Sequence, residues 1–128
     1  MRRIVLDAQY SVMTSALTMA LKQGGPDFQV QSAGPKTKDI VKLCRSCRAD
    51  VLLLEVCPHP PRTLQDRLLL ANDLRDVCPQ CKTVLLVDEA EYPELATAVC
   101  LAKKDHIVDV FVPASVSPAY LSAMMDTL

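Results

Sequence analysis

The sequence predicts an α/β fold with a doubly wound, five-stranded parallel sheet between two layers of helices. Five short runs of β-branched and aliphatic residues alternate with five stretches of helical periodicity along all 128 residues. Strand and helix units in series form parallel sheets with right-handed crossovers. The strand runs are almost continuously apolar, as expected where helices cover both faces of a sheet.

The first two strand and helix pairs fill the N-terminal part of the chain. A strand is predicted at Ile4–Leu6, and the helix after it carries two adjacent apolar rows at Val12, Met13, Ala16, Leu17, Ala20 and Leu21. A second strand is predicted at Phe28–Ser32, and the helix after it has one apolar stripe at Ile40, Leu43, Cys44 and Cys47. Recurrence at three and four residues is typical of a helix packed on one face.

The other three pairs repeat this order. Strands are predicted at Val51–Val56, Thr83–Val87 and Val108–Val112. Helical stripes follow them over residues 64–77, 95–102 and 121–128. Ser117 and Pro118 stand where a helix N-cap and a first-turn proline are favoured.

Composition excludes several classes of function. The length fits one domain, and a net charge of −1 gives no basic field for binding nucleic acid. No apolar run is long enough for a membrane span or a signal peptide, so the expected location is cytoplasmic. The loop at residues 7–11 has no glycine to cradle a phosphate, and neither a Ser-His-Asp set nor a Gly-x-Ser-x-Gly motif is present. An enzyme is therefore not predicted.

Two segments resemble the receiver domain of two-component response regulators, which has a flavodoxin-like (βα)5 fold. Residues 49–55 read Ala-Asp-Val-Leu-Leu-Leu-Glu and are similar to the third strand of that family. Residues 109–118 read Asp-Val-Phe-Val-Pro-Ala-Ser-Val-Ser-Pro and are similar to its fifth strand and the following loop. Element order extends the resemblance over residues 1–128 as a single domain, of the kind that forms the N-terminal part of helix-turn-helix transcription regulators.

The resemblance implies that most positions of the phosphorylation site are substituted. Glu55 stands where the family has its phosphate-accepting aspartate, and Asp88 stands at the Thr or Ser switch position. Ala114 takes the place of the lysine that neutralises the phosphate. Of the two acids that hold Mg²⁺ in the family, at most one is kept in this chain, at Asp7. Phe111 alone matches, at the aromatic switch position.

Glu55, Asp88 and Asp7 are expected to converge on an acidic pocket at the carboxyl ends of the strands. Converging carboxylates repel one another or recruit a cation, so three outcomes stay open: Mg²⁺ binds, one acid is protonated, or the loops hold the acids apart. The prediction is a degenerate receiver in two-component or phosphorelay signalling. It would act through protein–protein contact, as a homodimer, with little or no phosphate acceptance. An active receiver that uses a non-standard acid is an alternative.

The resemblance also bears on partners. Receivers dimerise through the fourth helix, fifth strand and fifth helix, or through the first and fifth helices, and either face is expected here. DNA would be contacted only through a C-terminal domain that is not in this chain, and no membrane contact is predicted.

Two Cys-x-x-Cys pairs, Cys44 with Cys47 and Cys78 with Cys81, provide a different alternative. Paired motifs of this kind are typical of zinc sites, and the helices that carry them are expected to be neighbours. Cys44, Cys47 and Cys78 continue apolar stripes, however, where free cysteine packs as a small hydrophobe. Core thiols are therefore predicted, with a zinc- or thiol-dependent sensor as the alternative.

Overall fold

The computed structural model describes residues 2–23, 27–33 and 37–128. Strands and helices alternate along the chain in the predicted order. The strands are β1 (Arg2–Asp7), β2 (Phe28–Ser32), β3 (Val51–Val56), β4 (Lys82–Val87) and β5 (Val110–Pro113). The helices are α1 (Ser11–Gln23), α2 (Thr37–Cys47), α3 (Leu64–Val77), α4 (Pro93–Lys104) and α5 (Pro118–Thr127).

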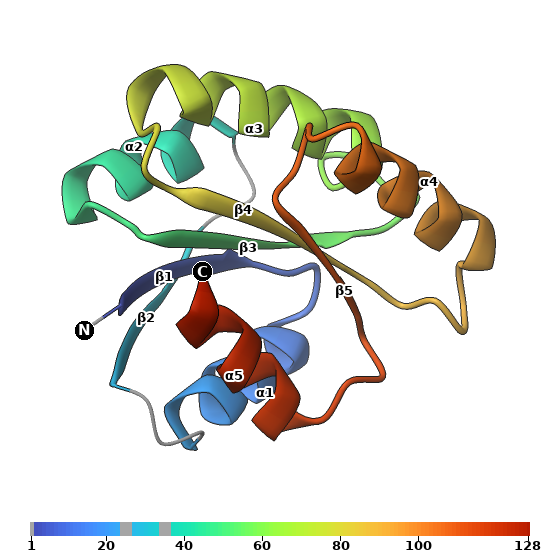
Figure 1. Ribbon diagram of the computed structural model, residues 1–128, viewed down its shortest axis with the longest axis horizontal. Coiled ribbons are helices and arrows are strands. Elements are labelled where there is room, and N and C mark those ends of the chain that lie inside the picture. Colours follow the sequence, from blue (N-terminus) through green and yellow to red (C-terminus); the bar gives the residue numbers. More distant parts are fainter. Residues whose placement is uncertain (1, 24–26, 34–36) are drawn as a thin grey trace.

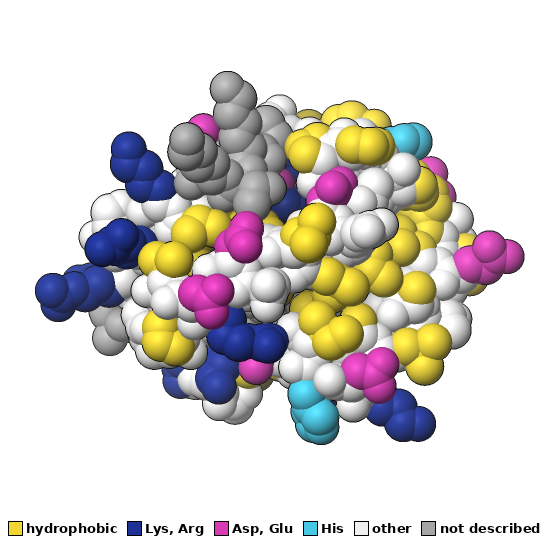
Figure 2. All heavy atoms as spheres, turned by 90° about the horizontal axis from the view of Figure 1, so that it is seen from above, with side chains coloured by type: hydrophobic (Ala, Val, Ile, Leu, Met, Phe, Trp, Pro, Cys, Tyr) yellow, Lys and Arg dark blue, Asp and Glu magenta, His cyan; other side chains and the backbone are white. Residues whose placement is uncertain are grey.

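The strands form one parallel sheet in the order β2-β1-β3-β4-β5. Helices α1 and α5 cover one face of this sheet, and α2, α3 and α4 cover the other (Figure 1). Figure 2 views the molecule from the side of α2, α3 and α4. The predicted doubly wound, three-layer fold is therefore confirmed. The direction of winding changes between β1 and β3, and ligand sites in such sheets gather at the carboxyl ends of the strands beside this change.

The sheet is buried on both faces, in two hydrophobic clusters. On β3, Leu52 and Leu54 pack among residues of α2, α3 and α4, whereas Val51 and Leu53 pack among residues of α1 and α5. All four side chains are at most 1% exposed. This double burial is the reason why the strand runs are continuously apolar.

Two helices begin with side-chain caps. The hydroxyl of Thr63 accepts the N–H of Asp66, and the carboxylate of Asp66 accepts the N–H of Thr63, which is a capping box at the start of α3. At the start of α5, the hydroxyl of Ser117 accepts the N–H of Tyr120, with Pro118 as the first helical residue. The cap predicted at Ser117 is therefore confirmed.

The prediction that the fifth strand begins at Val108 is wrong. The strand begins at Val110, which lies opposite Val84 of β4. Just before it, the carboxylate of Asp109 accepts the N–H of Thr83 at 2.8 Å. Val108 is buried but is not paired with β4. Its apolar side chain therefore reflects burial and does not mark the start of the strand.

One of the two apolar rows on α1 faces outward. Leu17 and Leu21 are buried against the sheet, whereas in the other row Val12 is 79% exposed and Ala16 is also exposed. Periodicity predicted the helix, but two adjacent apolar rows could not show which row packs. Among the described helices, none combines the length and apolar composition needed to cross a membrane.

We expect Leu54→Ala to lower the free energy of unfolding by about 2–5 kcal/mol, because Leu54 is fully buried in the central strand and truncation leaves a cavity. Leu69→Ala is the matched control, since Leu69 of α3 is 59% exposed, and should change it by less than about 0.5 kcal/mol. Urea denaturation measures both values. Equal losses would contradict the packing described for β3.

Candidate functional site

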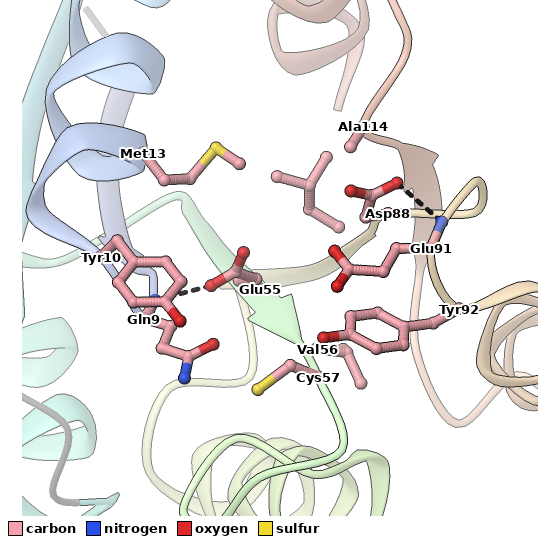
Figure 3. Close-up of a pocket in the computed structure, with 11 residues that line it drawn as sticks. Gln9, Tyr10, Met13, Glu55, Val56, Cys57, Asp88, Glu91, Tyr92 and Ala114 are labelled. Carbon is pink, nitrogen blue, oxygen red and sulfur yellow. Dashed lines mark hydrogen bonds between the residues drawn. The ribbon is translucent and has the colours of Figure 1, made fainter.

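The carboxyl ends of the strands surround a cavity of about 220 Å³ (Figure 3). Parallel strands end at the same edge of a sheet, so residues after β1, β3, β4 and β5 meet there. The cavity is lined by residues from all four of these loops and from α1: Gln9, Tyr10, Met13, Glu55, Val56, Cys57, Leu86, Asp88, Glu91, Tyr92 and Ala114.

Two of the three predicted acids lie in this cavity, and they are held by backbone amides. Glu55, the fifth residue of β3, accepts the N–H of Gln9 on its Oε1 at 2.6 Å. Asp88 accepts the N–H of Glu91 on its Oδ1 at 3.2 Å, and this bond closes the turn that precedes α4. The predicted convergence is therefore found for Glu55 and Asp88, and Glu91 joins them as a third acid that the sequence analysis missed.

The third predicted acid, Asp7, is buried and paired with arginine instead of lining the cavity. It is 3% exposed and is not among the described residues that line the cavity. Its Oδ2 lies 2.7 Å from Nη2 of Arg67 and 3.1 Å from Nε of Arg62, and its Oδ1 lies 3.1 Å from Nη2 of Arg62. Two guanidinium groups therefore neutralise one carboxylate, with a bidentate contact from Arg62.

Arg67 also ties three parts of the chain together. Its side chain is 1% exposed, and its Nε donates to the carbonyl of Glu55 at 2.9 Å. Burial lowers the pKa of Arg67, while the hydrogen bond and the charge of Asp7 oppose that shift. The guanidinium of α3 thus fastens the end of β3 to the end of β1.

Sequence reasoning missed Arg67 although a signal was present. Residues 67, 70, 71 and 74 are the buried positions of α3, and their spacing is that of one helix face. A charge on that face requires a buried partner, and Asp7, at the end of an apolar strand, was the available acid.

The remaining predicted positions lie apart from the acids or carry no charge. Ala114 lines the cavity, and its N–H is accepted by Oε2 of Glu89 at 3.0 Å. The pKa of Glu89 is lowered by hydrogen bonds to its carboxylate, and the bond with the Ser115 side chain has the largest effect. Phe111 packs against the hydrophobic cluster beneath α2, α3 and α4. It is not one of the described residues that line the cavity.

The residues at this edge do not fit a bound Mg²⁺ ion. The receiver resemblance assigns the metal to acids after the first strand, but both oxygens of Asp7 already accept bonds from arginine. Within residues 2–23, 27–33 and 37–128, no group of three or more His, Cys, Asp or Glu side chains is placed to hold a metal ion. Of the three outcomes left open, the structure favours the one in which Asp7 is kept apart from the other acids.

The four cysteines considered for zinc also form no metal-binding group among the described residues. Cys44, Cys78 and Cys81 are buried in the hydrophobic cluster beneath α2, α3 and α4, and Cys47 packs against it. The Cys78 thiol donates to the carbonyl of Cys44 at 3.7 Å. A hydrogen bond between the thiols of Cys44 and Cys81 lowers the pKa of Cys44 and raises that of Cys81. These contacts support the prediction of core thiols.

Comparison with known proteins identifies the fold. No protein-family model and no curated protein match this sequence. The CheY-like protein tadZ from Pseudomonas aeruginosa is 19% identical with a TM-score of 0.76, over 99% of this chain and 98% of that one. A LuxR-family DNA-binding response regulator from Staphylococcus aureus is 18% identical with a TM-score of 0.70, over 99% and 98%. A putative pilus assembly-related protein from Burkholderia pseudomallei is 14% identical with a TM-score of 0.74, over 99% and 88%. The chain has the fold of response-regulator receiver domains.

We expect Arg67→Met to lower the free energy of unfolding by about 3 kcal/mol. The substitution removes one of the two cations beside the buried Asp7, and it removes the donor to the carbonyl of Glu55. Arg62→Met should cost less, since its side chain is 13% exposed. Arg45→Met on the exposed face of α2 is the control and should change little. Chemical denaturation ranks the three variants, and an effect of Arg67→Met no larger than that of Arg45→Met would contradict the role given to Arg67.

Proposed function

We propose that this chain is a regulatory receiver domain that acts through protein–protein contact and does not accept phosphate through a Mg²⁺-dependent reaction. The observation that carries this proposal is the pair of arginines on Asp7. Their positive charge stands beside the acid to which the receiver resemblance would assign Mg²⁺, and three bonds from guanidinium N–H groups already engage both of its oxygens.

The charge of the cavity supports the same conclusion. Phosphoryl transfer requires cations that stabilise the charge on the transferred oxygens. The cavity presents Glu55, Asp88 and Glu91, and none of its described lining residues is Lys, Arg or His. A phosphoryl group carries a charge of about −2 near neutral pH, so three carboxylates would repel it.

Use of a different acid as phosphate acceptor has less support. Asp7 is buried behind Arg62 and Arg67, where an incoming phosphodonor has no approach from the cavity. Asp88 is in the cavity, but its carboxylate is engaged with the turn before α4. Neither acid has a neighbouring lysine on the cavity wall.

The contact partner in this proposal includes a second copy of the chain. On the elements that receivers use for dimerisation, Leu101 of α4 is 57% exposed and Tyr120 of α5 is 52% exposed. Single exposed apolar residues are common on monomers, so these residues identify candidate faces for a homodimer. Sedimentation of wild type, Leu101→Ser and Tyr120→Ser would test them.

The output of the domain is a separate part of the proposal. The similar structures include DNA-binding regulators and pilus assembly proteins, so the fold alone does not choose between transcription and assembly. DNA contact would depend on a further domain, because this domain carries a net charge of only −1 and nucleic-acid binding needs a basic surface.

We expect no response of backbone amide NMR signals to beryllofluoride with Mg²⁺, because the cavity offers neither a metal site nor a cation for a phosphoryl mimic. Mg²⁺ alone should be equally silent. A receiver with its aspartate and lysine intact, titrated in parallel, shows that the reagent is active. Shifts clustered around Gln9, Glu55, Asp88 and Ala114 would contradict the proposal.

A further inference from the structure

The acidic cavity opens beside an exposed apolar surface at the start of α1. Tyr10 is 66% exposed and Val12 is 79% exposed. A shallow hollow next to them is lined by Tyr10, Ser11, Val12, Met13 and Ala16. We call Tyr10, Val12, Met13 and Ala16 the α1 apolar patch. Tyr10 and Met13 also line the acidic cavity, so the two surfaces are continuous (Figure 3).

The cavity has acceptor capacity and negative charge that the described part of the protein leaves unneutralised. Both ion pairs found among the described residues involve Asp7, outside the cavity, and neither involves Glu55, Asp88 or Glu91. Glu55 and Asp88 each accept a bond from a backbone amide, and an ionised carboxylate can accept about four. The ring of Tyr10 lies beside the Glu55 carboxylate and the ring of Tyr92 lies beside Glu91 (Figure 3), and aromatic rings of this kind can contact a cation.

The size of the cavity limits what can enter it. Sites for free small molecules generally span about 300–1,000 Å³, and this cavity measures about 220 Å³. It can hold the end of one side chain. Carboxylates and aromatic rings together select a guanidinium or an ammonium group, whereas the apolar patch beside them selects aliphatic side chains.

We infer that this edge of the domain binds a protein segment that carries an arginine or lysine beside apolar residues. The basic side chain enters the cavity toward Glu55, Asp88 and Glu91, and its apolar neighbours cover the α1 apolar patch. This inference rests on the proposed function, since it specifies the partner of a domain that acts by contact. It also assigns the carboxylates a role that phosphate chemistry does not give them.

A different protein fits this surface better than a second copy of the chain. Among the described residues, one segment that combines exposed basic and apolar residues lies at the end of α4, at Leu101, Lys103 and Lys104. Contact between that segment and the start of α1 would join two different surfaces. Such a heterologous contact propagates into chains of molecules unless the rotation closes.

The test is selection from a display library of random short peptides on the immobilised wild-type domain. We expect enrichment of peptides in which an arginine or lysine has apolar neighbours. Glu55→Gln/Asp88→Asn should lose the requirement for the basic residue, and Val12→Ser should lose the requirement for apolar neighbours. Asp73→Asn, at an exposed position of α3, is the matched control and should keep both.

The affinity of the best peptide gives the magnitude. Replacing its basic residue by citrulline or another neutral isostere should weaken binding to wild type by about ten-fold or more, as expected for a charge-assisted contact. The same replacement should have little effect on Glu55→Gln/Asp88→Asn. The inference would be overturned if the enriched peptides carried no basic residue or if no peptide were enriched. It would also be overturned if copies of the domain bound one another at this surface and excluded the peptide. A response to beryllofluoride in the same samples would instead show that the proposed function fails.

Discussion

The arrangement of the loops at the carboxyl ends of the strands depends on the buried contact between Asp7 and Arg67. An ionised carboxylate in the interior is costly unless it is paired, and here the pairing joins the end of β1, the end of β3 and the first turn of α3. Arg67 of α3 and Arg62 of the loop between β3 and α3 both contact Asp7, so this loop is fastened to the end of β1. Glu55 remains in the cavity with Asp88 and Glu91, where its carboxylate accepts the N–H of Gln9.

This arrangement separates the two halves of the receiver site. In a working receiver, the acids after the first strand and the acceptor after the third share one divalent ion. Here the first acid is satisfied inside the protein, and the second faces a cavity whose other charges are also negative. The scaffold therefore keeps the fold of a receiver while its cavity is lined by acids and, among its described lining residues, by no Lys, Arg or His. In the function that we propose, regulation through a basic segment of a partner would follow from the same charges that would make phosphate acceptance unfavourable.

The fold could be predicted from the sequence because each strand is buried on both faces, and continuous apolar runs report that burial directly. The positions of Glu55 and Asp88 were predictable for the same reason, since both follow such runs. The role of Asp7 was not, because its partner Arg67 lies sixty positions away in sequence and strand patterns carry no information on which helix faces the strand end. Two adjacent apolar rows on α1 likewise left open which row would be exposed, and so the patch beside the cavity could not be anticipated.

We propose that Arg67 takes over at Asp7 the role that the receiver resemblance assigns to a metal. A double-mutant cycle with Asp7→Asn and Arg67→Met, followed by urea denaturation in EDTA and in excess Mg²⁺, tests it most directly. The account predicts a coupling free energy above about 1 kcal/mol, as found for contacting residues in one network, and the same value in both solutions. A coupling near zero, or wild-type stability that rises with Mg²⁺, would contradict it.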